Sequence, residues 1–357
     1  MKNVLISTGG TGGHVIPALS INDHLCNTFN TYIVTDLRGM KFIDKNKYKF
    51  DVIETPKLPS SIIKYPIYFF LLIYSLIKSF IYLKKKKINY LISTGGYMSM
   101  PFCIIAKFLS INIYLFEPNK VLGRSNKLIL GFSKKIICNY ENIINFPSKF
   151  ESKIFLVKPI LKKEIFLLNK NKKTPNDSLN ILVLGGSQGA NFFDQFVENL
   201  ILNLSKKFKI TVYQQVNNPN ILDKLKKKYL DNNIKSNIFT FDNDILKSMN
   251  KCNIAITRCG ASTIAELVYF NIPFIGIPFP FAKDNHQFYN AKFYEEKDCC
   301  WLYNQKDISL DKMLHLFNSI IENPKLYSKK YENLSKISYE YDWNNVNKKL
   351  IDLLDEN

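Results

Sequence analysis

Metal-ligand and disulfide spacings are missing from this sequence of 357 residues. Its seven cysteines include no Cys-x-x-Cys pair, and its four histidines are scattered along the chain. Zinc sites and disulfide-rich secreted domains depend on such spacings, so neither is indicated and we expect no bound metal. No charged leader with a cleavage site precedes the first apolar run, and we therefore expect a chain that is not exported from the reducing cytoplasm.

Acidic residues are also scarce. The chain has 30 Asp and Glu residues against 49 Lys and Arg residues, which gives a net charge of +19. Such a charge admits nucleic acid, an anionic membrane surface or a phosphorylated substrate as a partner. No DNA-binding or RNA-binding signature accompanies it, so we expect no nucleic-acid partner. Compositional bias in a chain rich in Lys, Asn and Ile explains many of these charges equally well.

The common nucleotide fingerprints are incomplete. A P-loop requires Gly-x-x-x-x-Gly-Lys, which does not occur, so an ATP-binding loop of that type is excluded. In "GGTGGH", the position of the third glycine of a dinucleotide fingerprint is Val15. Asp36, at the end of the second predicted strand, is the one feature that favours NAD. A nicotinamide oxidoreductase is therefore kept as the less favoured alternative.

Apolar runs that end in glycines are what the chain does contain. The hexapeptide LISTGG occurs at 5–10 and again at 91–96, and ILVLGGSQGANFF at 181–193 follows the same pattern. Each run is typical of a buried parallel strand that turns into a helix. Glycines let backbone N–H groups approach a ligand closely, and the positive end of the helix favours an anion. One such turn has a purely structural explanation, but three predict phosphate-bearing ligands.

Strand and helix patterns alternate along most of the chain. The alternation runs from residue 3 to residue 157 and resumes from residue 180 to residue 303. The segment between these parts is polar and basic and contains two prolines, which is typical of a linker. We predict an α/β protein with a first domain at 1–158, a linker at 159–178, a second domain at 179–340 and a C-terminal helix at 341–357 that returns toward the first domain.

Six motifs then resemble one known family in order and spacing. They are "GGTGGHVIPA", "TGGYMSMP", "EPN" followed by "LGRSNK", "LGGSQGAN", "TRCGASTIAE" and "PFAKDNHQFYNA". Together they resemble the MurG family of N-acetylglucosaminyltransferases over nearly the whole chain. The resemblance implies a GT-B fold, in which two Rossmann-like domains with parallel sheets face a central cleft.

The resemblance also implies an activity. It is the inverting transfer of N-acetylglucosamine from UDP-N-acetylglucosamine to the C4 hydroxyl of the muramoyl sugar of lipid I, which gives lipid II for peptidoglycan synthesis. No cofactor and no tightly bound metal are implied, and the process serves cell wall biogenesis, cell shape and cell division. A UDP-N-acetylglucosamine epimerase on the same fold is the main alternative.

Site residues follow from the resemblance in the same way. The two LISTGG turns would hold the acceptor diphosphate, and the third turn, with the Ser187 hydroxyl, would hold the nucleotide diphosphate. Glu266 would accept hydrogen bonds from the ribose, and Gln287 would contact the sugar with His286 and Asn290 nearby. The acceptor diphosphate residues are Gly10, Gly95, Gly96 and Tyr97, and the donor-binding residues are Thr11, Gly12, Gly13, Asn119, Ser187, Ala261, Ser262, Thr263, Glu266 and Gln287.

Two residues compete for the role of catalytic base. Inverting transfer needs one base to deprotonate the attacking hydroxyl. His14 lies at the amino end of the first predicted helix, where the helix dipole favours the neutral imidazole that a base requires. Glu117, in "FEPN", is the alternative base, although its carboxylate would equally serve to brace the loop or the histidine. We rank His14 slightly ahead.

The chain departs from the family pattern at two places. The family has a histidine and a glutamine on either side of Glu117, where this chain has Phe116 and Pro118. It also has an arginine where this chain has Leu161, so a neighbouring lysine would have to replace it at the donor. The candidates are Lys158, Lys162 and Lys163.

The segment 64–87, KYPIYFFLLIYSLIKSFIYLKKKK, is unusually apolar. Its stretch Pro66–Ile77 contains no charge over 12 residues, which is short of the roughly 20 that span a bilayer. As a helix, the segment has one narrow polar stripe, a wide apolar arc and four lysines at its end. We predict that it buries one side in its domain and rests the other on anionic lipid, at the cytoplasmic face of the inner membrane. A wholly buried helix is the alternative.

Overall fold

The computed structural model divides the chain into two compact units. Unit 1 consists of Met1–Lys163 together with Asp342–Asn357, and unit 2 is Glu164–Tyr341. The first part of unit 1 thus ends at Lys163, a few residues beyond the expected end of the first domain at 158. The structure describes residues 1–57, 59, 61–170, 175, 178–186, 190–216, 218–240, 242 and 244–355.

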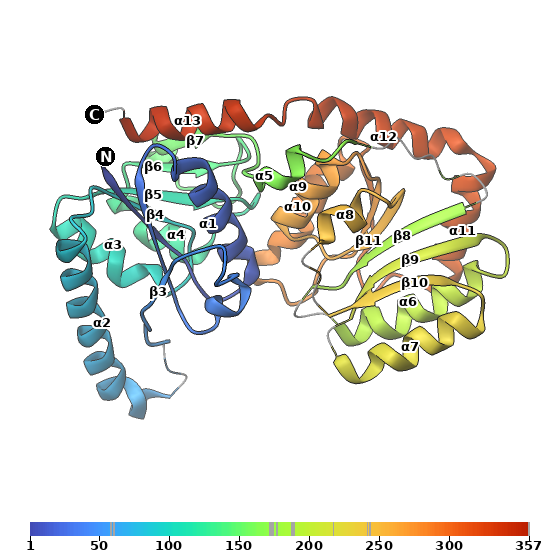
Figure 1. Cartoon of the computed structure of the whole chain (residues 1–357), viewed down its shortest axis with the longest axis horizontal. Helices are drawn as coiled ribbons and strands as arrows, with labels where there is room; N and C mark the ends of the chain where they lie inside the picture. Colours follow the sequence, from blue (N-terminus) through green and yellow to red (C-terminus); the bar gives the residue numbers. More distant parts are fainter. Residues whose placement is uncertain are drawn as a thin grey trace. The chain divides into compact units, whose positions relative to one another are not determined.

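Unit 1 is built on a sheet of seven parallel strands in the order β3-β2-β1-β4-β5-β6-β7 (Figure 1). Parallel strands need crossover connections, and short helices between successive strands supply them. The strands are β1 (Asn3–Ser7), β2 (Asn30–Thr35), β3 (Asp51–Val52), β4 (Tyr90–Ser93), β5 (Asn112–Glu117), β6 (Lys135–Cys138) and β7 (Ile154–Leu156).

Strands β1 and β4 place the two LISTGG copies side by side. Their register pairs Leu5 with Leu91, Ile6 with Ile92 and Ser7 with Ser93, so identical residues of the two copies lie opposite each other. The pairing continues past the strands, because the Thr94 hydroxyl donates to the Thr8 hydroxyl at 2.8 Å. Both glycine turns therefore leave the same edge of the sheet as immediate neighbours.

Helices cover both faces of this sheet, which explains why its strands are continuously apolar. Leu5 and Leu91 point to the face that carries α2 and α3, whereas Val4 and Ile6 point to the face that carries α1 and α13. The helices of unit 1 are α1 (Gly12–Leu25), η1 (Gly39–Phe42), η2 (Ile62–Lys64), α2 (Tyr65–Lys85), α3 (Ser99–Phe108), α4 (Arg124–Ile129), η3 (Leu130–Phe132), η4 (Ser148–Lys153) and α13 (Trp343–Asp355).

Unit 2 repeats the design with six parallel strands in the order β10-β9-β8-β11-β12-β13. One face packs its apolar residues against α6, α7 and α11, and α9 contacts α10 and α12. The strands are β8 (Ser178–Leu184), β9 (Lys209–Gln215), β10 (Lys235–Phe239), β11 (Ile254–Thr257), β12 (Phe274–Gly276) and β13 (Cys300–Leu302). The helices are α5 (Lys163–Phe166), α6 (Ala190–Leu204), α7 (Pro219–Asp231), α8 (Ile245–Met249), α9 (Ala261–Tyr269), η5 (Lys283–Asn285), α10 (His286–Glu295), α11 (Leu310–Glu322) and α12 (Pro324–Ser338).

The C-terminal helix α13 completes the core of unit 1. Its apolar face, which includes Leu350 and Leu354, is buried against α1 and the sheet. The Tyr114 hydroxyl on β5 donates to the carbonyl oxygen of Leu353 at 3.3 Å. At the other end of α13, the indole of Trp343 stacks on the imidazole of His24, with ring centroids 3.6 Å apart. The last helix is thus held by burial, a hydrogen bond and a ring stack.

We expect the His24 stack to make unit 1 sensitive to acid. Burial lowers the pKa of His24 to about 4, with the Asn347 side chain opposing the shift. An unfolded histidine binds its proton near pH 6.5, so the unfolded state binds more protons between pH 6.5 and 4 and the free energy of unfolding falls as pH falls. The loss should be about 2 kcal/mol between pH 7 and pH 5.

The substitution His24→Phe keeps a ring against Trp343 and removes the titrating group. Urea unfolding at pH 7 and at pH 5 measures how much free energy of unfolding the parent and the variant each lose. The variant should lose about 2 kcal/mol less than the parent, on the same linkage argument. Equal losses in the two proteins would show that His24 does not control the acid response.

Candidate functional site

The paired glycine turns of unit 1 form the candidate site of that unit. Gly10, Gly95 and Gly96 have φ values of +84°, +95° and +85°, a region that side chains with a Cβ rarely adopt. The turns also touch, because a Cβ on Gly96 would lie 3.6 Å from the carbonyl oxygen of Gly9. Residues with a Cβ at these three positions would strain the backbone.

His14 lies in the first turn of α1 and reaches across to the second glycine turn. Its Nδ1 is 2.7 Å from the carbonyl oxygen of Thr94, and its Cε1 would be 3.2 Å from a Cβ on Gly95. A carbonyl oxygen accepts hydrogen bonds only, so Nδ1 carries the proton and the lone pair of the neutral ring lies on Nε2. This tautomer is the one in which Nε2 can accept a proton.

Asp36 follows β2 and is almost completely buried beside the first turn. Its Oδ1 accepts hydrogen bonds from the backbone N–H groups of Gly10 at 2.8 Å and Gly39 at 2.7 Å. Its Oδ2 accepts two from the guanidinium of Arg38, at 3.1 and 2.8 Å. Burial alone would raise the pKa of Asp36, but these hydrogen bonds outweigh it and the pKa is lowered. The position of Asp36 in the sequence favours NAD, but the structure shows its carboxylate bound to groups within unit 1.

Glu117 ends β5 and is buried, with both carboxylate oxygens occupied. Oε1 accepts hydrogen bonds from the backbone and the side chain of Asn119, at 3.2 and 2.9 Å. Oε2 accepts from the backbone of Gly123 at 2.7 Å and from the Asn126 side chain at 3.0 Å. Four hydrogen bonds to one carboxylate fix the loop that follows β5, and this arrangement favours the bracing role over that of a base.

The other predicted residues of unit 1 lie around these groups. Thr11 caps the start of α1, its carbonyl oxygen accepting from the backbone of His14, and Gly12 and Gly13 form the first residues of the helix. Tyr97 is exposed in the second turn, whereas the half-buried Asn119 is held by Glu117.

The third glycine turn begins the candidate site of unit 2. Gly186 has a φ of +64°, and a Cβ on Gly185 would lie 3.2 Å from the Cβ of Phe193 in the first turns of α6. The glycine at 185 thus allows α6 to pack close against the turn. The predicted Ser187 lies outside the described residues.

Gln287 and Asn290 on α10 hold the loops of unit 2 rather than pointing freely into solvent. The Gln287 side-chain oxygen accepts from the backbone N–H groups of Cys259 at 3.2 Å and Phe279 at 2.9 Å. The Asn290 side chain is fully buried and donates to the carbonyl oxygen of Cys259 at 3.2 Å.

On α9, Glu266 is half-buried one turn after Ala261, Ser262 and Thr263, which form the first turn of that helix. His286 contacts the carbonyl oxygen of Lys283 through Nδ1 at 2.8 Å.

Arg258 is a buried residue of unit 2 that the sequence analysis did not assign. Its guanidinium donates to the carbonyl oxygens of Ile277 and Pro278, both at 3.0 Å, and to the Gln305 side chain at 2.6 Å. It also lies over the ring of Phe193, 4.6 Å from the centroid. Burial lowers the pKa of Arg258 to about 10. Its position within "TRCGASTIAE" was the signal that it belongs to this site.

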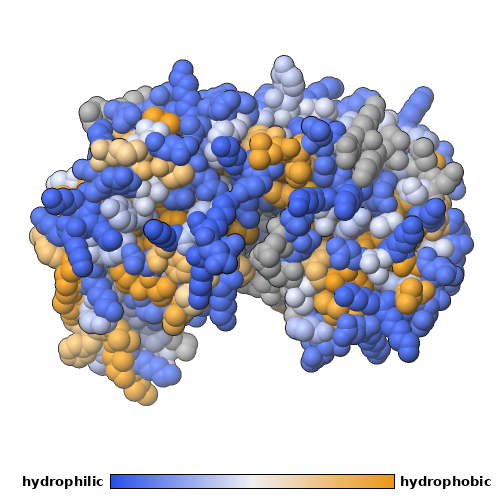
Figure 2. Space-filling model, viewed as in Figure 1, coloured by the Kyte–Doolittle hydropathy of each residue, from blue (hydrophilic) through white to orange (hydrophobic). Residues whose placement is uncertain are grey.

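Helix α2 presents a wide apolar surface on unit 1. Its buried residues are Ser75, Ser79 and Leu83, so the narrow polar stripe faces the protein and the wide apolar arc faces outward. Phe70 at 73% and Ile67 at 65% exposure are examples, and Figure 2 shows the hydrophobic surface over this helix. The alternative of a wholly buried helix is wrong. Among the described helices, Ile62–Lys85 alone is long and apolar enough to cross a membrane by length and composition.

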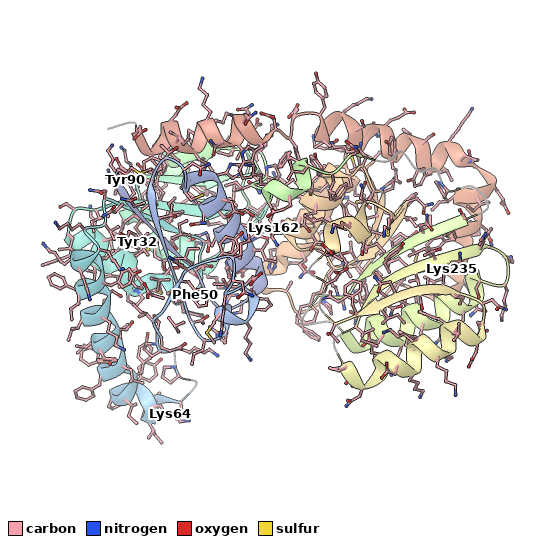
Figure 3. All side chains as sticks on the ribbon, viewed as in Figure 1. Tyr32, Phe50, Lys64, Tyr90, Lys162 and Lys235 are labelled. Atoms are coloured by element: carbon pink, nitrogen blue, oxygen red, sulfur yellow. The ribbon has the colours of Figure 1, made fainter. Side chains whose placement is uncertain are left out.

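Within the same described residues, no group of three or more His, Cys, Asp and Glu side chains could hold a metal ion. Leu161, at the family's arginine position, is buried, and the adjacent Lys162 is half-buried (Figure 3). Which lysine replaces that arginine stays a prediction.

Comparisons with known proteins cover the whole chain. Residues 4–138 match the glycosyltransferase family 28 N-terminal domain, and residues 180–342 match the glycosyltransferase family 28 C-terminal domain. The chain is 44% identical over 359 aligned residues to the UDP-N-acetylglucosamine--N-acetylmuramyl-(pentapeptide) pyrophosphoryl-undecaprenol N-acetylglucosamine transferase of Pelagibacter ubique, covering 100% of this chain and 99% of the relative. The chain belongs to this family of glycosyltransferases.

Two further comparisons agree with this membership of the MurG family. The transferase of the same name from Rickettsia bellii is 33% identical over 347 residues, covering 94% of this chain and 95% of the relative. The crystal structure of Acinetobacter baumannii MurG superposes with a TM-score of 0.75 at 22% identity and covers all of both chains. The predicted GT-B fold is confirmed, and the epimerase and oxidoreductase alternatives are not favoured.

We expect Glu117→Gln to destabilise unit 1. In either orientation, the glutamine amide points its NH₂ group at two N–H donors that bind a carboxylate oxygen in the parent. Two hydrogen bonds are therefore lost in a buried place. The cost should be roughly 2–4 kcal/mol. Thermal unfolding followed by circular dichroism measures it, with the exposed Glu141→Gln as a matched control in the same unit. Equal melting temperatures for the two variants would contradict the bracing role.

Proposed function

We propose that this chain transfers N-acetylglucosamine from UDP-N-acetylglucosamine to the C4 hydroxyl of the muramoyl sugar of lipid I, which gives lipid II for peptidoglycan synthesis. The observation that carries the proposal is the 44% identity to a curated transferase over the full length of both chains. Unit 1 binds the lipid diphosphate acceptor and unit 2 binds the nucleotide sugar.

His14 is the catalytic base in this proposal. Its Nδ1–H group is fixed by the carbonyl oxygen of Thr94, which leaves the lone pair on Nε2. Nε2 takes the proton of the C4 hydroxyl while that oxygen attacks the anomeric carbon from the face opposite UDP. The bond between the anomeric carbon and UDP breaks, and UDP leaves with the electron pair. Attack from the opposite face inverts the configuration of the sugar.

Glu117 supports the reaction indirectly by holding the loop after β5. Its contacts with both the backbone and the side chain of Asn119 orient that residue, which we assign to the sugar of the donor. The four hydrogen bonds engage both oxygens of this carboxylate with the loop itself, which suits a positioning role.

Unit 2 supplies the donor contacts. The turn at Gly185 and Gly186, followed by the amino end of α6, suits the diphosphate of UDP. The first turn of α9 contacts the nucleotide, and Glu266 accepts hydrogen bonds from the ribose hydroxyls. Gln287 reads the sugar while its side-chain oxygen ties two loops together.

We infer that unit 1 rests on the membrane that carries lipid I through the apolar surface of α2. Phe69, Phe70 and Ile67 are exposed along the helix, and Lys64 lies at its amino end (Figure 3). Exposed lysines follow at its other end, as expected for a helix that lies flat on an anionic surface.

The second half of the same helix is attached to unit 1, which argues against a membrane span. Ser75 and Ser79 are buried, and the Thr55 hydroxyl is 3.3 Å from the Ser75 hydroxyl. Tyr82 donates to the Asp51 carboxylate at 2.7 Å. A spanning helix would have to break these contacts, so we propose peripheral attachment at the cytoplasmic face of the cell membrane.

A transfer assay tests the function directly. The protein is incubated with radiolabelled UDP-N-acetylglucosamine and lipid I, and the lipid is then extracted. Label in the lipid fraction is expected. Free epimerised nucleotide sugar without labelled lipid would replace the proposal with the epimerase alternative.

We expect His14→Ala to lower kcat by roughly 10²–10⁴-fold, the usual contribution of a general base. The affinity for UDP should change little, because the donor residues of unit 2 are untouched. Steady-state kinetics measure both quantities, with His315→Ala, an exposed histidine on α11, as the matched control. A fall of less than tenfold would pass the role of base to another residue.

The lysines at the end of α2 should carry much of the attraction to anionic lipid. Lys84, Lys85 and Lys87 are exposed, and each contributes about 1 kcal/mol near such a surface. Replacing the three by glutamine should weaken binding to anionic vesicles about a hundredfold at low salt, and binding to neutral vesicles should hardly change.

Vesicle co-sedimentation at two salt concentrations measures this effect. The matched control replaces Lys224, Lys226 and Lys227 of α7 by glutamine. These lysines are exposed in unit 2, and their replacement removes the same charge. If both triple variants bind anionic vesicles equally, total charge rather than α2 controls the attachment.

A further inference from the structure

Two of the backbone N–H groups in the paired glycine turns are engaged within unit 1. The Gly10 N–H group donates to Asp36 at 2.8 Å, and the Gly95 N–H group donates to the Ser93 hydroxyl at 3.2 Å. A diphosphate carries several negative charges, and hydrogen bonds from ionised donors are about twice as strong as those between neutral groups. The paired turns therefore need a cation close to them.

Arg38 is the cation that the structure places there. Its Nη2 would lie 3.7 Å from a Cβ on Gly10, so the guanidinium lies against the first glycine turn. The Arg38 side chain is 49% exposed, whereas that of Asp36 is 5% exposed. The positive partner of this ion pair thus faces solvent at the turn, and the negative partner is buried behind it.

The Asp36–Arg38 pair leaves donors for a ligand. Arg38 uses Nε and Nη2 to bind one oxygen of Asp36, at 3.1 and 2.8 Å. A guanidinium has five N–H groups in a planar fork, so three remain beyond these two contacts. Because Asp36 already fixes the plane of the fork, little side-chain entropy is lost when an anion binds to it.

Glycine at position 39 fixes this arrangement against the first turn. A Cβ on Gly39 would lie 2.2 Å from the Thr35 hydroxyl and 3.1 Å from the Cα of Gly9. A Cβ on Gly9 would lie 2.9 Å from an oxygen of Asp36. The backbone at Gly39 is therefore packed closely onto the first turn, and this packing keeps the backbone of Arg38 beside that turn.

We propose that Arg38 binds the diphosphate of the lipid acceptor, with Asp36 as the positioning residue for its guanidinium. The inference rests on the proposed function, since lipid I carries a diphosphate between its sugar and its prenyl chain. Arg38 contacts the diphosphate and takes no part in the chemical step. Its loss affects acceptor binding rather than the rate of transfer from a saturated enzyme.

The test compares Arg38→Gln with the parent and with Lys41→Gln. Lys41 is an exposed cation three residues further on in η1 and controls for charge alone. In Arg38→Gln, the KM for a short-chain lipid I analogue should rise about 10- to 100-fold, as expected when a charge-assisted hydrogen bond is lost. Inhibition by farnesyl diphosphate should weaken in parallel. The kcat, the KM for UDP-N-acetylglucosamine and the inhibition by UDP should stay within about twofold, because these do not depend on acceptor binding.

Separate measurements distinguish the acceptor diphosphate from two other phosphate ligands, which are the nucleotide sugar and the anionic lipid headgroups. If Arg38→Gln raises the KM for the nucleotide sugar instead, Arg38 serves the donor and the inference is wrong. If it weakens co-sedimentation with anionic vesicles and leaves the acceptor KM unchanged, Arg38 binds lipid headgroups and the inference is again wrong. A parent enzyme that transfers no label to lipid I would contradict the proposed function itself, whereas an active parent with an unchanged variant contradicts only the role of Arg38.

Arg38→Lys keeps the test decisive if Arg38→Gln fails to fold. Lysine retains the charge but lacks the fork, so the acceptor KM should rise severalfold with an unchanged circular dichroism spectrum. An acceptor KM equal to that of the parent in Arg38→Lys would overturn the assignment.

Discussion

The in-register pairing of β1 with β4 is the constraint on which the candidate site of unit 1 depends. It brings two copies of one hexapeptide to the same edge of the sheet, so that both glycine turns begin at the same height. A slip of one residue would turn the buried side chains to the opposite face of the sheet and separate the turns. The reach of His14 from α1 to Thr94 exists only because the second turn starts beside the first.

Local patterns in the sequence predict most of the elements but few of their neighbours. An apolar run that ends in glycines specifies a buried strand followed by a helix, because it combines burial with a backbone that only glycine adopts readily. The order β3-β2-β1-β4 depends on contacts between residues far apart in the chain, and no local pattern encodes it. The wide apolar arc of α2 did predict an exposed face, since one core contact cannot cover so much of a helix.

Site residues were harder to assign because a polar side chain near a ligand loop can serve the ligand or the loop. Asp36 stands where a nucleotide-binding carboxylate would stand, yet its oxygens hold Gly10, Gly39 and Arg38. Arg258 shows the same ambiguity, with bonds to two carbonyl oxygens and a glutamine in unit 2. Such internal hydrogen bonds depend on the exact course of the loops, which residue type and spacing do not determine.

Unit 1 is assembled from the two ends of the chain, with all of unit 2 between them. A ribosome makes the amino end first, so the part of unit 1 that packs against α13 stays uncovered while Glu164–Tyr341 is being synthesised. Unit 2 is continuous and has all its residues before α13 emerges. Unit 2 is therefore able to fold before unit 1 is finished. A nascent chain that stalls before α13 is made carries a complete unit 2 and an unfinished unit 1, whose open hydrophobic surface chaperones would have to protect.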